Sequence, residues 1–151
     1  MDHGVYAAEL FLKGYNCAQS VVVAFCDVTG LKENFAARMA SSFGGGIGRM
    51  REVCGAVSGM YMVLGALYGY DETAEDDGRK KQLYKDVQAL AAQFREECGS
   101  IICREILKNP PSDPNPTPRT GEFYKKRPCA RMVITAATLL DEFIAQHPIE
   151  E

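Results

Sequence analysis

The stretch VCGAVSGMYMVLGALYGY, residues 53–70, runs for 18 residues without a charged side chain. That length is at the lower edge of what spans a membrane, and the spacing of Gly55 and Gly59 also suits close helix packing there. However, the chain has no second segment of this kind, and its charges are well mixed elsewhere. We therefore predict a buried central helix from about Glu52 to Tyr68, and no membrane insertion.

The rest of the chain is patterned as helices on both sides of this stretch. Gly14 and Gly30 follow apolar runs at positions typical of helix C-terminal caps. Thr73-Ala74-Glu75-Asp76 opens the longest predicted helix in the manner of a capping box. No strand-like alternation persists, so we predict an all-α fold, a compact multi-helix bundle. The predicted helices cover residues 5–13, 17–28, 33–42, 52–68, 73–97, 100–108 and a last segment that starts at Pro128.

The 151-residue chain is long enough to bury a core, and we expect one helical domain over residues 1–151. Its formal charge of −3 supplies no overall attraction to nucleic acid or to an anionic membrane, and no basic stripe with interleaved aromatic residues is present. Asp2, His3 and Glu9 interrupt any apolar run at the start, which argues against a signal peptide. We therefore expect a cytoplasmic protein, whose six cysteines serve in catalysis, redox sensing or metal binding rather than in structural disulfides.

Five of the seven prolines fall in residues 109–121, which have no helical potential. A loop of this length in a compact domain is often functional. Two interpretations are equally open. The segment is either a solvent-exposed connector, or a lid over the cysteine region, because it joins the predicted helices of Cys103 and Cys129.

Four of the six cysteines lie where a helix is predicted to begin. Helix N-termini expose N–H groups and the positive end of the macrodipole, and both favour a thiolate over a thiol. Each of the four also heads the apolar stripe of its own helix, so we expect them to point toward one site in the core. They are Cys17, Cys54, Cys103 and Cys129.

Basic residues flank these cysteines in the sequence. A helix dipole contributes about 0.3–1 kcal/mol, which lowers the pKa of a thiol by less than about one unit. A reactive thiolate therefore needs nearby cations or a metal, while burial raises the pKa. Seven of the 17 Lys and Arg residues are placed to supply that charge: Arg49, Arg51, Arg104, Lys125, Lys126, Arg127 and Arg131.

The remaining candidates carry weaker signals. Cys26, half a turn out of phase with Cys17, and Cys98, beside two glutamates, are interpreted as packing residues. The glycine run at 44–48 lacks the strand and the lysine of a phosphate-binding loop. We predict a tight turn that brings backbone close to Cys54. A small anion on its N–H groups and on Arg49 or Arg51 is the alternative.

Several segments stand out together: GYNCAQ (14–19), FGGGIGR (43–49), CGAVSG (54–59), GSIICRE (99–105) and Cys129. They resemble the redox-active protein family named for a C…GCAxxG…C…C pattern, and the resemblance covers nearly the whole chain. It implies that the four cysteines at the predicted helix starts are the functional residues, but it names no substrate. Val53 stands where the pattern has a glycine, and Gly55-Ala56 follows Cys54.

Three functions are therefore open. The first is a thiol redox protein, a thiol–disulfide oxidoreductase or electron carrier that needs no cofactor. In it Cys54 attacks a redox partner or a small-molecule oxidant, Cys17 resolves the product, and Cys103 and Cys129 form a second pair. The second is a module in which all four thiolates bind zinc or an iron–sulfur cluster, although no C-x-x-C spacing supports it. The third is a helical interaction protein with structural cysteines, for example a homodimer through the Gly-rich helix.

Overall fold

The computed structural model describes residues 1–71, 78–121, 123 and 128–149. Within those ranges the regular structure is helical, and the only paired extended residues are Val53 and Ile102, in one isolated antiparallel bridge. The all-α prediction is confirmed. The helices are α1 (His3–Leu12), α2 (Cys17–Ala24), α3 (Cys26–Thr29), α4 (Glu33–Ala40), the 3₁₀ helix η1 (Ser41–Phe43), α5 (Gly55–Tyr68), α6 (Arg79–Cys98), α7 (Cys103–Ile106) and α9 (Cys129–Gln146).

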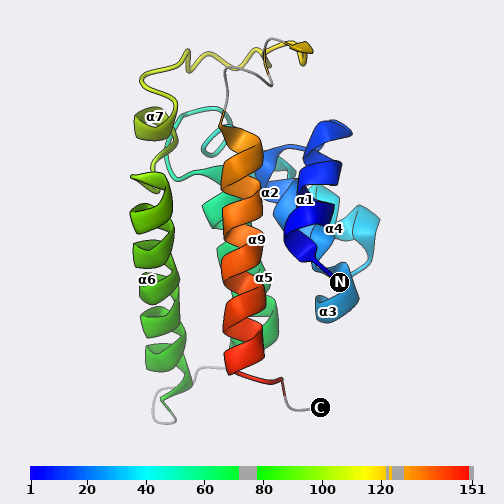
Figure 1. The fold of residues 1–151 in the computed structure, drawn as a ribbon, viewed down its shortest axis with the longest axis vertical. Coiled ribbons are helices and arrows are strands. Elements are labelled where there is room, and N and C mark those ends of the chain that lie inside the picture. The colour runs from blue at the N-terminus through cyan, green and yellow to red at the C-terminus, as the bar shows by residue number, and fades with distance from the viewer. Residues whose placement is uncertain (72–77, 122, 124–127, 150–151) are drawn as a thin grey trace.

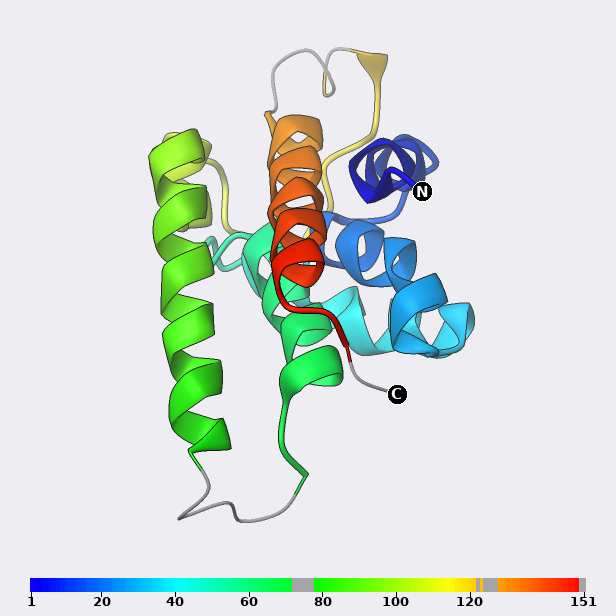
Figure 2. The ribbon, with the colours of Figure 1, turned by 60° about the horizontal axis from the view of Figure 1, so that its bottom comes forward.

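Helices α5 and α9 form the centre of the molecule (Figures 1 and 2). The long helix α6 packs on one side of this pair, and α1 to α4 gather on the other side. Helix α9 contacts α1, α2, α5 and α6, so it joins the two sides. Its inward face carries the residues that its helical period predicts, with Val133, Ala136 and Leu140 fully buried.

The charge-free stretch forms helix α5, whose first six residues are all buried. Gly59 permits close contact with α2, because a Cβ there would lie 2.9 Å from the carbonyl oxygen of Ala18. The part of α5 around Gly59 is therefore occupied by the same chain, whereas a Cβ on Gly65 would meet nothing within 4 Å. A homodimer through the Gly-rich helix, one of the three interpretations, stays a prediction, and it would have to use a part of α5 other than Gly59. No helix in the described ranges is both long and apolar enough to cross a membrane.

Tertiary contacts move several helix ends from their predicted positions. Helix α5 begins at Gly55 rather than Glu52, because Val53 pairs with Ile102 as extended backbone. The predicted helix 17–28 is divided at Phe25, whose N–H donates to the carbonyl of Val22 in a tighter turn. Cys26 is therefore the first residue of α3, not a position on the opposite face of α2.

The second half of the chain differs in a similar way. The predicted capping box at residues 73–76 lies outside the described ranges. Within those ranges, helix α6 begins at Arg79. On α6 Leu90 and Phe94 are buried, but Tyr84 is 52% exposed and does not belong to the core. The helix predicted for residues 100–108 is reduced to the single turn of α7. Residues 110–120 have no helix or strand and run across one end of the molecule (yellow in Figure 1).

Candidate functional site: a pocket lined by four cysteines

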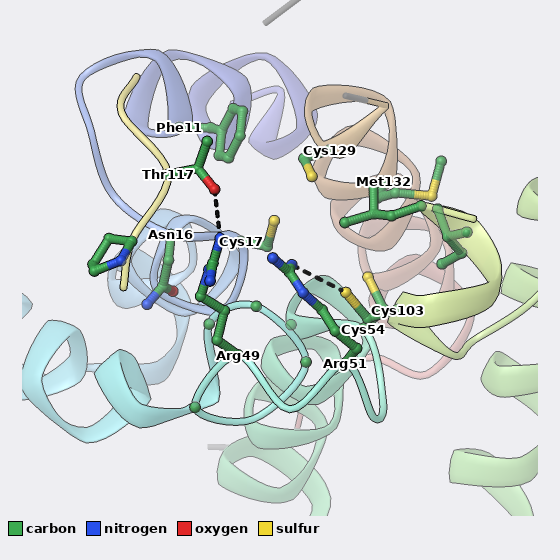
Figure 3. Close-up of a pocket in the computed structure, with 18 of the residues that line it drawn as sticks. Phe11, Asn16, Cys17, Arg49, Arg51, Cys54, Cys103, Thr117, Cys129 and Met132 are labelled. Carbon is green, nitrogen blue, oxygen red and sulfur yellow. Dashed lines mark hydrogen bonds between the residues drawn. The ribbon is translucent and has the colours of Figure 1, made fainter. Parts of the chain in front are cut away.

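The four cysteines at the predicted helix starts line one cavity of about 340 Å³ (Figure 3). Cys17, Cys103 and Cys129 are the first residues of α2, α7 and α9, and Cys54 immediately precedes α5. Segments far apart in the sequence therefore meet at one end of the bundle. No disulfide joins any of the six cysteines, all of which lie in the described ranges.

Local hydrogen bonds position these cysteines. At the start of α2, the Asn16 side chain accepts from the N–H of Gln19 at 2.8 Å, and the Gln19 side chain accepts from the N–H of Asn16 at 3.0 Å. This capping box places Cys17 in the first turn. Cys54 and Cys103 are linked through the backbone on either side of the isolated bridge. The N–H of Cys54 donates to Ile101 at 2.7 Å, and the N–H of Cys103 donates to Glu52 at 2.6 Å.

The glycine run forms the wall of the pocket beside Cys103. Gly46 has a φ of +73°, and a Cβ on it would lie 2.7 Å from the Cβ of Cys103. The prediction was a close approach of this backbone to Cys54. The structure instead places Gly46 next to Cys103. Within the run, the N–H groups of Ile47 and Gly48 donate to the carbonyls of Phe43 and Ser42, at 3.3 and 2.7 Å. These two N–H groups are used within the loop, and the small-anion alternative stays a prediction.

Arg51 points into the pocket among the cysteine sulfurs (Figure 3). It is 3% exposed and adopts a left-handed conformation with φ +62°. Its Nε donates to the carbonyl of Pro111 at 2.9 Å, and its Nη1 donates to the Sγ of Cys103 at 3.7 Å. Its Nη2 is buried and has no hydrogen-bond acceptor in the described part of the chain. A cation therefore lies inside the cluster of thiols.

The Pro-rich segment contributes residues to the wall of the pocket. Pro114, Pro116 and Thr117 contribute to its lining. Arg49 holds the segment, because its Nη1 donates to the carbonyl of Asp113 at 2.5 Å and its Nη2 donates to the hydroxyl of Thr117 at 2.7 Å. These residues thus form part of the pocket wall, and the choice between a connector and a lid stays open.

Two arginines depart from the sequence-based expectation. Arg104 is not a pocket-lining residue, because its guanidinium group pairs with the exposed Glu52 at 2.7 Å. Arg119 lines the pocket although it is not near a cysteine in sequence. It donates to the carbonyls of Phe11 and Tyr15 at 2.9 and 2.8 Å, and its guanidinium carbon is 4.5 Å from the centre of the Phe11 ring. No local motif marks Arg119, because its partners lie about a hundred residues earlier in the chain.

The other candidates lie elsewhere. Arg131 donates to the carbonyl of Glu97, outside the pocket. Lys125, Lys126 and Arg127 are outside the described ranges. Cys26 and Cys98 do not line the pocket, and burial raises the pKa of each of their thiols.

Burial opposes ionisation of two pocket cysteines. Cys54 is 5% exposed, and burial raises the pKa of its thiol to about 12, although the N–H groups of Ala56 and Val57 act in the opposite direction. A hydrogen bond with Cys129 and then burial raise the pKa of the Cys17 thiol well above its ordinary value. The small contribution of a helix start is outweighed at both positions. Cys54 is therefore not the low-pKa nucleophile expected from its place before a helix.

The described residues contain no group of three or more Cys, His, Asp or Glu side chains arranged to hold a metal ion. The four thiols converge on one cavity, but as positioned they do not form a ligand set for zinc or a cluster.

Comparison with known families gives one match. The family model described as "Putative redox-active protein (C_GCAxxG_C_C)" matches residues 15–143. This range covers all four pocket cysteines as well as Arg51 and the Pro-rich segment. Neither the search of curated proteins nor the search of solved structures returned a match. The chain belongs to this redox-active protein family.

Proposed function

We propose that the protein performs reversible thiol–disulfide chemistry in its pocket, and that Cys17 and Cys129 are the pair that closes into a disulfide. The observation that carries this proposal is the hydrogen bond between their two side chains. Sulfurs in hydrogen-bond contact need only a local shift to reach the bond length of about 2.05 Å in a disulfide. This pairing replaces the pair of Cys54 and Cys17 that the sequence suggested.

The pKa of Cys17 supports a division of roles between the two cysteines. The raised pKa of Cys17 supports it as the member of the pair that keeps its proton, and in this proposal its S–H group donates to the sulfur of Cys129. Donation of a hydrogen bond stabilises negative charge on the acceptor. Cys129 is thus the attacking sulfur and Cys17 the resolving thiol.

The reaction balances with a disulfide-bearing redox partner. The sulfur of Cys129 attacks one sulfur of the partner disulfide, whose S–S bond breaks to release a thiolate. Cys17 then gives up its proton and attacks Cys129, which releases the second partner thiol. The protein loses two electrons and two protons and gains one internal disulfide, and the partner becomes two thiols. The reverse sequence reduces the protein.

The test is a redox titration followed by intact-mass measurement. Reduced protein is equilibrated in dithiothreitol buffers of increasing oxidised fraction, and its thiols are then blocked. We expect a reversible loss of two hydrogens, with the bridge mapped to Cys17 and Cys129 by peptide analysis. Cys17→Ser and Cys129→Ser each abolish the loss, whereas Cys26→Ser, outside the pocket, retains it. Retention of all hydrogens across the titration, or a bridge that excludes both residues, contradicts the proposal.

A further inference from the structure

We infer that Cys103 is a site of oxidation by a peroxide, and that Arg51 holds the resulting sulfenate. This inference rests on the proposed function, because it names an oxidant class for the same pocket. It concerns a different cysteine from the disulfide pair and a chemical form that precedes any disulfide. It can therefore fail or succeed independently of that pair.

The hydrogen bonds of Arg51 carry the inference. A guanidinium group presents two parallel N–H groups that fit two adjacent acceptor atoms, as in a carboxylate or a phosphate. At Arg51 one arm already has an acceptor, since Nη1 donates to the Sγ of Cys103 at 3.7 Å. The other arm, Nη2, is buried without an acceptor in the described part of the chain. A sulfenate supplies the missing atom, because its oxygen is bonded directly to the sulfur that Nη1 contacts.

The cost of this arrangement supports a functional role for Arg51. A buried donor without an acceptor costs free energy, and more so when it is charged. Arg51 is 3% exposed and also occupies a left-handed backbone conformation, which is uncommon for a residue with a side chain. Strain of this kind persists where the surroundings enforce it, and it concentrates at functional sites. Here the bond from Nε to the Pro111 carbonyl aligns the group.

The neighbouring backbone positions Cys103, the sulfur partner of Arg51. The N–H of Cys103 donates to the carbonyl of Glu52 at 2.6 Å, one residue beyond Arg51. Gly46 lies close to Cys103, since a Cβ on Gly46 would be 2.7 Å from the Cβ of Cys103. The thiol and the guanidinium group are thus held together by the backbone on both sides, and both line a cavity of about 340 Å³ that admits a small oxidant.

The chemistry is a two-electron oxidation of sulfur. The guanidinium group favours the thiolate of Cys103. The thiolate attacks one oxygen of a hydroperoxide, the O–O bond breaks and an S–O bond forms. The second oxygen leaves as hydroxide or alkoxide and takes a proton to become water or an alcohol. A second pocket thiol then attacks the Cys103 sulfur, forms an S–S bond and expels the first oxygen as water.

The experiment traps the sulfenate. Protein reduced under anaerobic conditions is mixed with one equivalent of hydrogen peroxide in the presence of dimedone, which reacts with sulfenic acids, and the adduct is mapped by peptide mass analysis. We expect the adduct on Cys103. Because Arg51 supplies charge-assisted hydrogen bonds to the reacting sulfur and oxygen, Arg51→Met slows its formation at least about tenfold. Arg51→Lys, which keeps the charge but lacks the fork, lies between the two.

The control is Arg131→Met, which removes an arginine that lies outside the pocket and leaves the rate unchanged. An adduct confined to other cysteines of the wild-type protein overturns the inference without reference to any variant. Equal rates in the wild type and Arg51→Met overturn it as well. If a bridge between Cys17 and Cys129 forms in dithiothreitol buffers while Cys103 gives no adduct, this inference fails and the proposed function stands. If Cys103 gives the adduct while no bridge forms between Cys17 and Cys129, the proposed disulfide pair fails and the inference about Cys103 stands.

Discussion

His3 and Arg51 are both basic side chains withdrawn from solvent, 6% and 3% exposed, and they have opposite surroundings. His3 joins helices α1, α3 and α9. Its Nδ1 lies 2.6 Å from a carboxylate oxygen of Asp141, its Nε2 lies 2.9 Å from one of Asp27, and its ring stacks on Phe25 at 4.1 Å. We call these four residues the His3 cluster. Every polar atom of the His3 ring has an acidic partner.

Arg51 is paired with a carbonyl and a sulfur, and its Nη2 has no acceptor within the described ranges. A fully partnered buried group adds to stability, whereas an incompletely partnered one lowers it. Proteins depart from local consistency chiefly at functional sites. The comparison therefore assigns a structural role to the His3 cluster and a chemical role to the pocket around Arg51.

The largest expected difference between the pocket and the His3 cluster is in how the free energy of unfolding depends on alkaline pH. Burial raises the pKa of Cys54 to about 12 and, with the bond to Cys129, raises that of Cys17, whereas an unfolded thiol ionises near 8.5. Above about pH 8.5 the unfolded chain has lost protons that the folded pocket retains. The free energy of unfolding therefore falls as pH rises, by up to about 1.4 kcal/mol per pH unit for each thiol.

Urea denaturation between about pH 8 and pH 10 measures this slope. Cys17→Ala and Cys54→Ala should each make it shallower, because each removes one retained proton. His3→Ala should leave the slope unchanged, because this variant keeps both buried thiols. A wild-type slope no steeper than that of a variant with both Cys17→Ala and Cys54→Ala would contradict the buried-thiol account.

Gly46→Ala should disturb the backbone that forms the pocket wall beside Cys103. The added Cβ would lie 2.7 Å from the Cβ of Cys103 and 2.8 Å from the Cα of Arg51, at a φ of +73°. Steric overlap and left-handed strain together predict a loss of about 3 kcal/mol in the free energy of unfolding. Gly48→Ala is the matched control. It has a φ of +55° but nothing within 4 Å of the new Cβ, so the strain alone costs about 1 kcal/mol. Equal losses in the two variants would show that Gly46 is not in close contact with the pocket.

His3→Ala breaks the other region. It removes a buried ring from Phe25 and leaves Asp27 and Asp141, which are partly exposed, without their shared partner. We expect a loss of about 2 kcal/mol in urea denaturation. His147→Ala is the control, because that exposed ring bonds a carbonyl of its own helix, and it should cost less than about 1 kcal/mol. A His3 variant as stable as the control would remove the structural half of the comparison.

The helical fold follows from local patterns that the sequence displays openly. Charge-free residues 53–70 and the apolar period of α9 are such patterns, and they predict the two central helices. The helix ends are less predictable where they depend on distant backbone. The bridge from Val53 to Ile102 shortens α5, and no sequence pattern near Val53 predicts this bridge.

The site is predictable to a similar depth. Residue type and helix starts single out the four cysteines that line the pocket. Their ionisation is not predictable in this way, because burial depends on packing that the sequence does not display, and at Cys54 it exceeds the helix contribution. Arg119 and the His3 cluster were missed for the same reason. The ring of His3 meets a carboxylate 138 residues away, where no local period connects the two.

The most direct test of the account measures two quantities in two variants, His3→Ala and Arg51→Met. The quantities are the free energy of unfolding in urea and the rate at which peroxide oxidises the pocket. His3→Ala should lose about 2 kcal/mol and keep the wild-type rate. Arg51→Met should stay within about 1 kcal/mol of the wild type, because the removal of a poorly partnered buried cation offsets its lost bonds, and should react at least about tenfold more slowly. If each variant changes both quantities together, the division between a structural cluster and a chemical pocket is wrong.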